Sequence, residues 1–105
     1  MTVYQQKAYL DHWFKKMSDT MLSKGDDYAN EDRLSNFKLA GNIAGTGAEL
    51  NCLNLIATKV ARLGTLLNQQ NQKPKNESIE DSLLDLANYA TLLSMLINER
   101  NSNGQ

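Results

Sequence analysis

Two long segments in the second half of the sequence repeat apolar residues at steps of three and four, the spacing of one helix face. In the first segment the repeat consists of Leu50, Leu53, Ile56, Val60, Leu63 and Leu67. In the second it consists of Ile79, Leu83, Leu86, Ala90, Leu93 and Ile97, widened by Leu84, Ala87, Leu92, Met95 and Leu96. No segment alternates as a strand would. The sequence therefore predicts an all-α protein, and the breadth of the last apolar face predicts self-association.

The first half of the sequence has fewer clear signals for where its helices begin and end. Thr2 can cap a first helix whose apolar residues recur at helical spacing, and Gly25 stands where a left-handed C-terminal cap is typical. A short second helix is expected over about residues 30–40. The three glycines of residues 41–47, "GNIAGTG", then disfavour regular structure.

The two later helices have start signals of their own. Thr46 and Glu49 have the spacing of a capping box, in which each side chain satisfies a backbone amide of the first turn. Ser78 and Asp81 repeat that spacing before the last helix. Pro74 lies in the polar connector between the two helices and excludes a helix running through it. We therefore expect these two helices to pack antiparallel.

The expected fold is a four-helix bundle-like single domain over residues 1–100, followed by a flexible polar tail over residues 101–105. The chain has 105 residues, 41% of them hydrophobic, which is enough for one modest core. A net charge of -1 gives no overall attraction to long nucleic acids or anionic membranes. The single cysteine, Cys52, excludes an internal disulfide. With no secretory or membrane-spanning pattern, we expect a cytoplasmic protein with no membrane partner.

The polar residues of the last two helices are grouped. Asp81, Asp85 and Asn88 recur at positions i, i+4 and i+7, so they project from one face. Lys59 and Arg62 are neighbours at i, i+3 on the preceding helix. If the two helices are antiparallel, these faces meet. Such a pocket could hold a phosphate, with Lys and Arg on its oxygens and carboxylates on a bridging magnesium ion.

A structural explanation competes with this one. Asp81 near a helix N-terminus can simply cap the helix and complement its dipole. Acidic and basic helix faces also form ordinary ion pairs. Asp85 and Asn88 are harder to explain in this way because they lie within the most apolar part of the chain. A buried carboxylate there needs a partner.

The charged stretch "KGDDYANEDRLSNFK", residues 24–38, offers further candidates for ligand binding. These are Lys24, Asp27, Tyr28, Arg33, Asn36 and Phe37. Asn36 and Phe37 lie one turn beyond Arg33, so a ring for stacking, an amide and a guanidinium would cluster, which suits a base and its phosphate. In the alternative, Phe37 and Leu34 belong to the core and the charges are solvated. Tyr28 is expected to act either as a lid or as a packing anchor.

Three motifs together resemble the small phage and bacterial proteins of the nucleotide modification associated domain group. They are the K-x-x-D-Y of "KGDDY", the K-x-x-R-L of "KVARL", and the helix "SIEDSLLDLANYATLL" at residues 78–93. The resemblance covers about residues 20–98. It implies an all-α nucleotide-binding protein that is encoded by a phage, acts in the host cytoplasm and forms a homo-oligomer.

That group is in turn similar to the MazG-type nucleoside triphosphate pyrophosphohydrolases, which bind magnesium with two pairs of acidic residues. This chain departs from that pattern: Glu49 has no acidic residue three or four positions later. We therefore expect nucleotide binding without turnover and without a cofactor, for nucleotide metabolism or sequestration of an immune signal. One alternative is magnesium-dependent hydrolysis with Asp81 and Asp85, joined by Glu49 or Glu31. The other is a structural or partner-binding helical protein.

Overall fold

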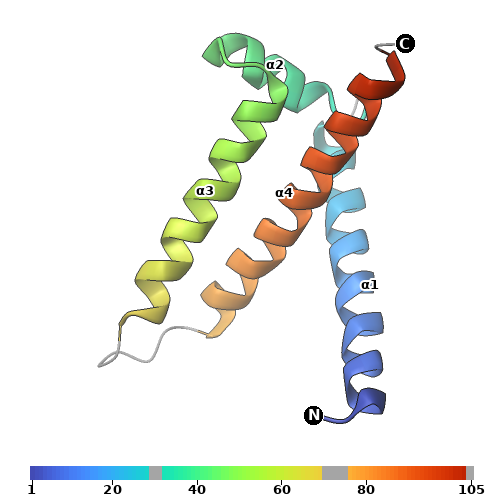
Figure 1. Ribbon diagram of the computed structural model, residues 1–105, viewed down its shortest axis with the longest axis vertical. Helices are drawn as coiled ribbons and strands as arrows, with labels where there is room; N and C mark the ends of the chain where they lie inside the picture. The colour runs from blue at the N-terminus through green and yellow to red at the C-terminus, as the bar shows by residue number, and fades with distance from the viewer. Residues whose placement is uncertain (29–31, 70–75, 104–105) are drawn as a thin grey trace. The chain divides into compact units, whose positions relative to one another are not determined.

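The computed structural model describes residues 1–28, 32–69 and 76–103 (Figure 1). Within these ranges the side chains of residues 25–28, 76–78 and 103 are not described. Within these residues the chain forms four helices and no strand, which confirms the all-α prediction. The helices are α1 (Val3–Tyr28), α2 (Ser35–Ala44), α3 (Ala48–Leu67) and α4 (Asn76–Asn103). None of them, over the described residues, is long and apolar enough to cross a membrane. The chain divides into two compact units, Met1–Arg33 and Leu34–Gln105.

The first unit consists of α1 and the residues after it. Thr2 caps the helix as expected: its Oγ1 accepts a hydrogen bond from the Gln5 amide at 3.1 Å, and Gln5 Oε1 accepts one from the Thr2 amide at 2.8 Å. This is a reciprocal capping box with Gln as the return residue. The expected stop at Gly25 is wrong, because the helix continues through it to Tyr28.

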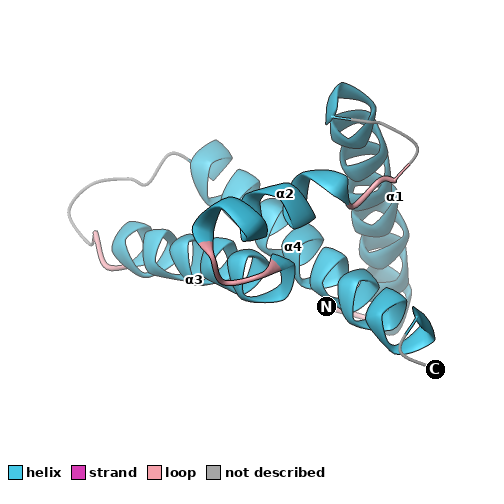
Figure 2. Ribbon diagram, turned by 90° about the horizontal axis from the view of Figure 1, so that it is seen from above, coloured by secondary structure: helices cyan, strands magenta, loops and turns pink. Residues whose placement is uncertain are grey.

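The second unit is built on α3 and α4, which run antiparallel side by side (Figure 1). Its core is a cluster of Leu34, Cys52 and Leu96, one residue from each of three parts of the chain. Partly buried residues pack around this cluster: Phe37, Ala48, Tyr89, Leu92 and Leu93. Seen from above, α2 lies across the end of the hairpin formed by α3 and α4 (Figure 2). Burial of these side chains is the main force that holds the three helices together.

The corner between α2 and α3 is fixed by backbone contacts. The helix expected to end near Ala40 instead runs through Gly41 to Ala44 and ends at Gly45, which has a left-handed φ of 75°. The Gly41 carbonyl accepts hydrogen bonds from the amides of Thr46 at 3.2 Å and Gly47 at 3.1 Å. A Cβ at Gly41 would lie 2.3 Å from the Gly47 carbonyl carbon, so this close approach requires glycine.

The helix starts differ from the expected capping boxes. The N-cap of α3 is Gly47, and no side chain caps the helix, so the predicted pairing of Thr46 with Glu49 is wrong. Glu49 instead accepts a hydrogen bond from Arg100. The last helix begins at Asn76, which places Ser78 inside its first turn; the Ser78 side chain lies outside the described set. It continues to Asn103, three residues into the expected tail, and residues 104–105 lie outside the described part.

The apolar repeat of α3 belongs to two different sides of the helix. Cys52 and Leu63 are buried on the side that faces α4. On the other side Leu50, Leu53, Val60 and Leu67 are exposed by 59%, 49%, 54% and 66%. On α4, by contrast, Leu84 and Leu96 are buried, and among its described side chains only Leu83 and Met95 are exposed large apolar residues. The uncovered apolar surface of this hairpin therefore lies mainly on α3, whereas the sequence predicted that it would lie on the last helix.

Candidate functional site

The polar residues expected to meet between the two long helices do so in part. Lys59 Nζ lies 3.0 Å from Asp85 Oδ2, with side-chain exposures of 22% and 21%. The antiparallel pairing of α3 and α4 brings these residues, 26 positions apart in the sequence numbering (85 − 59), to the same level of the hairpin. We call Lys59, Arg62, Asp85 and Asn88 the polar cluster.

Arg62 lies one turn after Lys59 on α3, at the spacing that makes two helical residues surface neighbours. Its side chain is exposed. Among the described residues Arg62 forms no ion pair or hydrogen bond, so Lys59 alone of the two cations contacts the Asp85 carboxylate. Arg62 is therefore positioned to meet something in solvent, while Lys59 is already held by the protein.

Asn88 lies three residues after Asp85 on α4 and is 7% exposed. Its Oδ1 is buried and has no hydrogen-bond partner. A buried acceptor without a donor costs about 1–3 kcal/mol, so native proteins seldom leave one unexplained. Among the predicted ligand-binding residues whose side chains the structure describes, Asn88 is the one whose surroundings call for a further group.

The residues of the charged stretch have separate roles. Arg33 Nη2 donates to the Leu22 carbonyl at 2.9 Å, so this side chain folds back on α1. Phe37 packs on the core cluster, as the alternative explanation required. Asn36 and Lys24 are exposed. The Asp27 and Tyr28 side chains lie outside the described set.

The acidic residues proposed for magnesium do not form a cluster. In the described residues, no group of three or more His, Cys, Asp or Glu side chains lies close enough to hold a metal ion. Asp81 is exposed, Asp85 pairs with Lys59, and Glu49 pairs with Arg100 at 2.7 Å. Glu31 lies outside the described residues.

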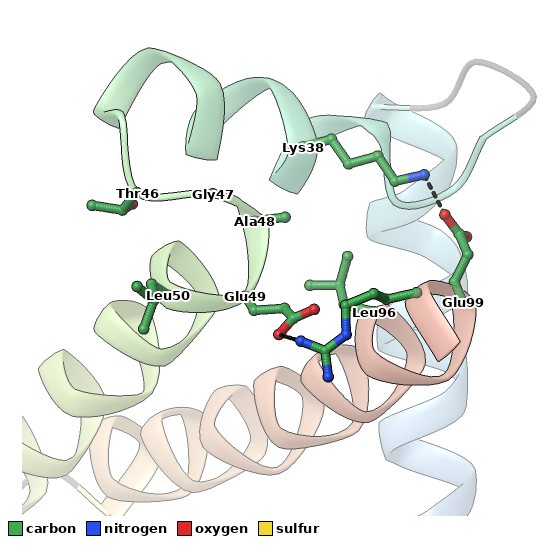
Figure 3. A pocket seen from close by; sticks show the side chains of 9 residues that line it. Lys38, Thr46, Gly47, Ala48, Glu49, Leu50, Leu96 and Glu99 are labelled. Atoms are coloured by element: carbon green, nitrogen blue, oxygen red, sulfur yellow. Dashed lines mark hydrogen bonds and ion pairs between the residues drawn. The ribbon is translucent and has the colours of Figure 1, made fainter. Parts of the chain in front are cut away.

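A pocket of about 530 Å³ lies between α2, the start of α3 and the end of α4 (Figure 3). It is lined by Lys38, Thr46, Gly47, Ala48, Glu49, Leu50, Leu96, Glu99 and Arg100. None of the ten residues predicted to bind a ligand is among them. No sequence pattern predicts this pocket, because the residues that meet across it are 51 and 61 positions apart.

Two ion pairs cross this pocket and balance its charge. Lys38 pairs with Glu99, and Arg100 pairs with Glu49, so each cation of the lining contacts a carboxylate (Figure 3). Arg100 in the last turn of α4 and Glu49 in the first turn of α3 also complement the dipoles of their helices. These contacts explain how the end of α4 is fastened to α2 and α3.

Cys52 is the remaining reactive group near the middle of the hairpin. Its side chain is fully buried, and its thiol donates to the Tyr89 carbonyl at 3.4 Å. Burial raises the pKa of this thiol above its ordinary value of 9.0. A thiol that is inaccessible and protonated is a poor nucleophile, so Cys52 serves the packing of α3 on α4.

Comparison of the chain with protein-family models, with curated proteins and with solved structures gave no match.

Proposed function

We propose that this protein binds a nucleotide or a nucleotide-derived signalling molecule at the polar cluster, without turning it over. The observation that carries the proposal is the buried, unpaired Oδ1 of Asn88, one helical turn from the carboxylate that holds Lys59. A ribose hydroxyl or a base N–H is a donor of the kind that this oxygen lacks. The three sequence motifs quoted above support nucleotides as the ligand class.

The cations supply the complementary chemistry. Lys59 is half-buried and oriented by Asp85, while Arg62 presents a guanidinium to solvent one turn away. Guanidinium groups bind phosphate oxygens through two parallel hydrogen bonds, and an ammonium adds a point charge. In this proposal Arg62 captures a phosphate first, and Lys59 and Asn88 then fix the ligand between the helices.

The biological setting comes from the resemblance alone. It favours a phage protein that acts in the host cytoplasm, either in nucleotide metabolism or by sequestering a nucleotide immune signal. Sequestration requires retention rather than catalysis. The lack of an acidic cluster among the described residues fits that requirement better than hydrolysis on several metal ions.

The first experiment is to purify the protein under native conditions, denature it, and identify any released small molecule by mass spectrometry. Binding is then measured by calorimetry with a panel of linear and cyclic nucleotides. Arg62→Ala is expected to abolish binding with little change in melting temperature, because Arg62 is exposed. Lys15→Ala is the matched control, since Lys15 forms an exposed ion pair with Asp19 at 2.6 Å in α1.

Asn88→Leu separates a binding role from a structural one. It removes an unpaired buried acceptor while keeping similar volume, so the free protein should be as stable as the wild type or more stable. Nucleotide binding should nevertheless be lost. Unchanged binding in both Asn88→Leu and Arg62→Ala would refute the proposed site.

A second candidate function is that of a partner-binding helical protein, in which Lys59 and Asp85 are only an internal ion pair. The exposed apolar side of α3 is the observation that favours it. If it is correct, no nucleotide in the panel binds, and Asp85→Ala lowers stability without any effect on a ligand.

The catalytic alternative is magnesium-dependent hydrolysis of a nucleoside triphosphate to the monophosphate and pyrophosphate. It would use Asp81 and Asp85. Incubating the protein with magnesium and a panel of nucleoside triphosphates, with pyrophosphate release as the readout, tests it directly. Turnover that Asp81→Asn abolishes would replace the binding proposal with this one.

A further inference from the structure

One side of α3 carries small and apolar residues at every position of a strict three-four repeat. The residues of this outer stripe are Leu50, Leu53, Ala57, Val60, Gly64 and Leu67. All six are exposed in the structure. Steps of three and four over such a length are the pattern of a helix that packs along a second helix. None of the six is charged.

We infer that the outer stripe packs against the outer stripe of a second copy of this chain, with the two α3 helices antiparallel. The order of residue sizes supports this pairing. When two stripes are aligned end to end in opposite directions, Leu50 lies opposite Leu67 of the other copy. Leu53 then lies opposite Gly64, and Ala57 opposite Val60.

In the middle layers of this alignment a larger residue therefore lies opposite a smaller one. In the end layers leucine lies opposite leucine. Close-packed interfaces need such matching, because two large side chains at the centre would hold the helices apart. A Cβ built on Gly64 meets no atom within 4 Å in the single chain, so the space that Leu53 of the other copy would use is open. A parallel pairing would instead place Gly64 against Gly64 and leave a gap.

The electrostatics also favour a second copy in this direction. Antiparallel helices bring the partly positive N-terminus of each α3 beside the partly negative C-terminus of the other. No like charges meet, because the stripe itself is uncharged.

The size of the stripe sets the strength of the expected contact. From Leu50 to Leu67, at about 1.5 Å per residue, it is roughly 25 Å long, and a helix with side chains is about 10–12 Å wide. Stable complexes typically bury about 800 Å² on each partner, which is more than this strip provides. The inference is therefore a weak, reversible dimer. It does not depend on the proposed function, because Arg62 lies on the opposite side of α3 from the stripe.

Sedimentation equilibrium of the full chain over a wide concentration range tests the inference. The wild type should shift from monomer to dimer as concentration rises. Val60→Lys should stay monomeric, because it places a charge at the centre of the interface. Thr58→Lys is the matched control: it adds the same charge on an exposed position away from the stripe, and should dimerise like the wild type.

Cysteine cross-linking tests the direction of the helices. Leu50→Cys and Leu67→Cys are prepared separately, then mixed and oxidised; buried Cys52 makes the wild type the background control. A disulfide that forms in the mixture, and not in either variant alone, supports the antiparallel pairing. Cross-linking of Leu50→Cys with itself would overturn it.

Two results would overturn the inference as a whole. One is a wild type that remains monomeric at every concentration. The other is a Val60→Lys variant that dimerises as the wild type does. A Val60→Lys variant that melts at a lower temperature without any change in mass would show that another part of the same chain covers the stripe.

Discussion

Both sides of α3 carry apolar residues, but one side is buried and the other is exposed. The inner side, with Cys52 and Leu63, is buried against α4 and also holds the Lys59–Asp85 ion pair. The outer side, with Leu53 and Val60, is about half exposed. Hydrophobicity alone therefore does not decide which side of this helix is covered. What differs is the neighbour: α4 is joined to α3 by the chain and meets only one side.

The comparison also separates two kinds of task. On the inner side a charged pair interrupts the apolar surface, and such a pair is costly to bury unless it is well placed. On the outer side no charge interrupts the stripe. We associate the inner side with ligand chemistry and the outer side with association between chains, and the following predictions test that distinction.

The largest expected loss of stability is for truncation of Leu63, which is 8% exposed and lies on the inner side. Leu63→Ala should lower the free energy of unfolding by about 2–3 kcal/mol, through lost burial and the cavity left behind. Leu53→Ala on the outer side should cost less than about 1 kcal/mol. Urea unfolding at low protein concentration, where chains are monomeric, measures both. Equal losses would mean that the outer side is covered within one chain.

The next effect contrasts two glycines. Gly41→Ala forces a Cβ to within 2.3 Å of the Gly47 backbone and should cost about 1–3 kcal/mol. Gly64→Ala on the outer side meets nothing within 4 Å and should stabilise the monomer by about 0.5–1 kcal/mol, because alanine favours helix. Thermal unfolding followed by circular dichroism measures both. A stabilising Gly41→Ala would show that the α2–α3 corner is looser than described.

A smaller effect is expected for the ion pair. Lys59→Ala removes a partner of Asp85 at a site shielded from water and should cost about 1–2 kcal/mol. Lys15→Ala removes an exposed pair and should cost less than about 0.5 kcal/mol. The first loss should also depend less on salt than the second, because solvent screens a shielded pair weakly. Unfolding at low and high salt gives both comparisons.

The smallest effect concerns Cys52. Its thiol pKa is raised in the folded chain, so as the pH rises past the ordinary value of 9.0 the unfolded chain loses this proton first. The folded state then binds more protons than the unfolded state, and stability falls with rising pH. Below that pH the group has no such effect. Wild type and Cys52→Ala are compared by urea unfolding on both sides of pH 9.0: the wild type should have the steeper alkaline decline, and equal slopes would contradict the assignment.

The features predicted correctly from the sequence are those set by neighbouring residues or by strong periodicity. The Thr2 cap follows from local hydrogen bonding, and the two long helices follow from their apolar repeats. Once those helices are antiparallel, each position on one helix lies beside a fixed position on the other. The contact between Lys59 and Asp85 follows from this.

The features that sequence did not predict depend on contacts between distant residues. Glu49 was expected to cap α3, but its carboxylate forms an ion pair with Arg100 from the end of α4. Gly41 was expected to break a helix, but its lack of a side chain serves the close approach of the α2–α3 corner. Phe37 had two possible roles until the core cluster placed it among Leu34, Cys52 and Leu96.

The corner between α2 and α3 has a practical consequence. Because the Gly41 carbonyl and two main-chain amides hold it, the Thr46 side chain is not needed to maintain the turn. Thr46 is exposed and lines the pocket in Figure 3. A fluorophore attached through Thr46→Cys would thus report events beside that pocket while the hairpin keeps its native geometry.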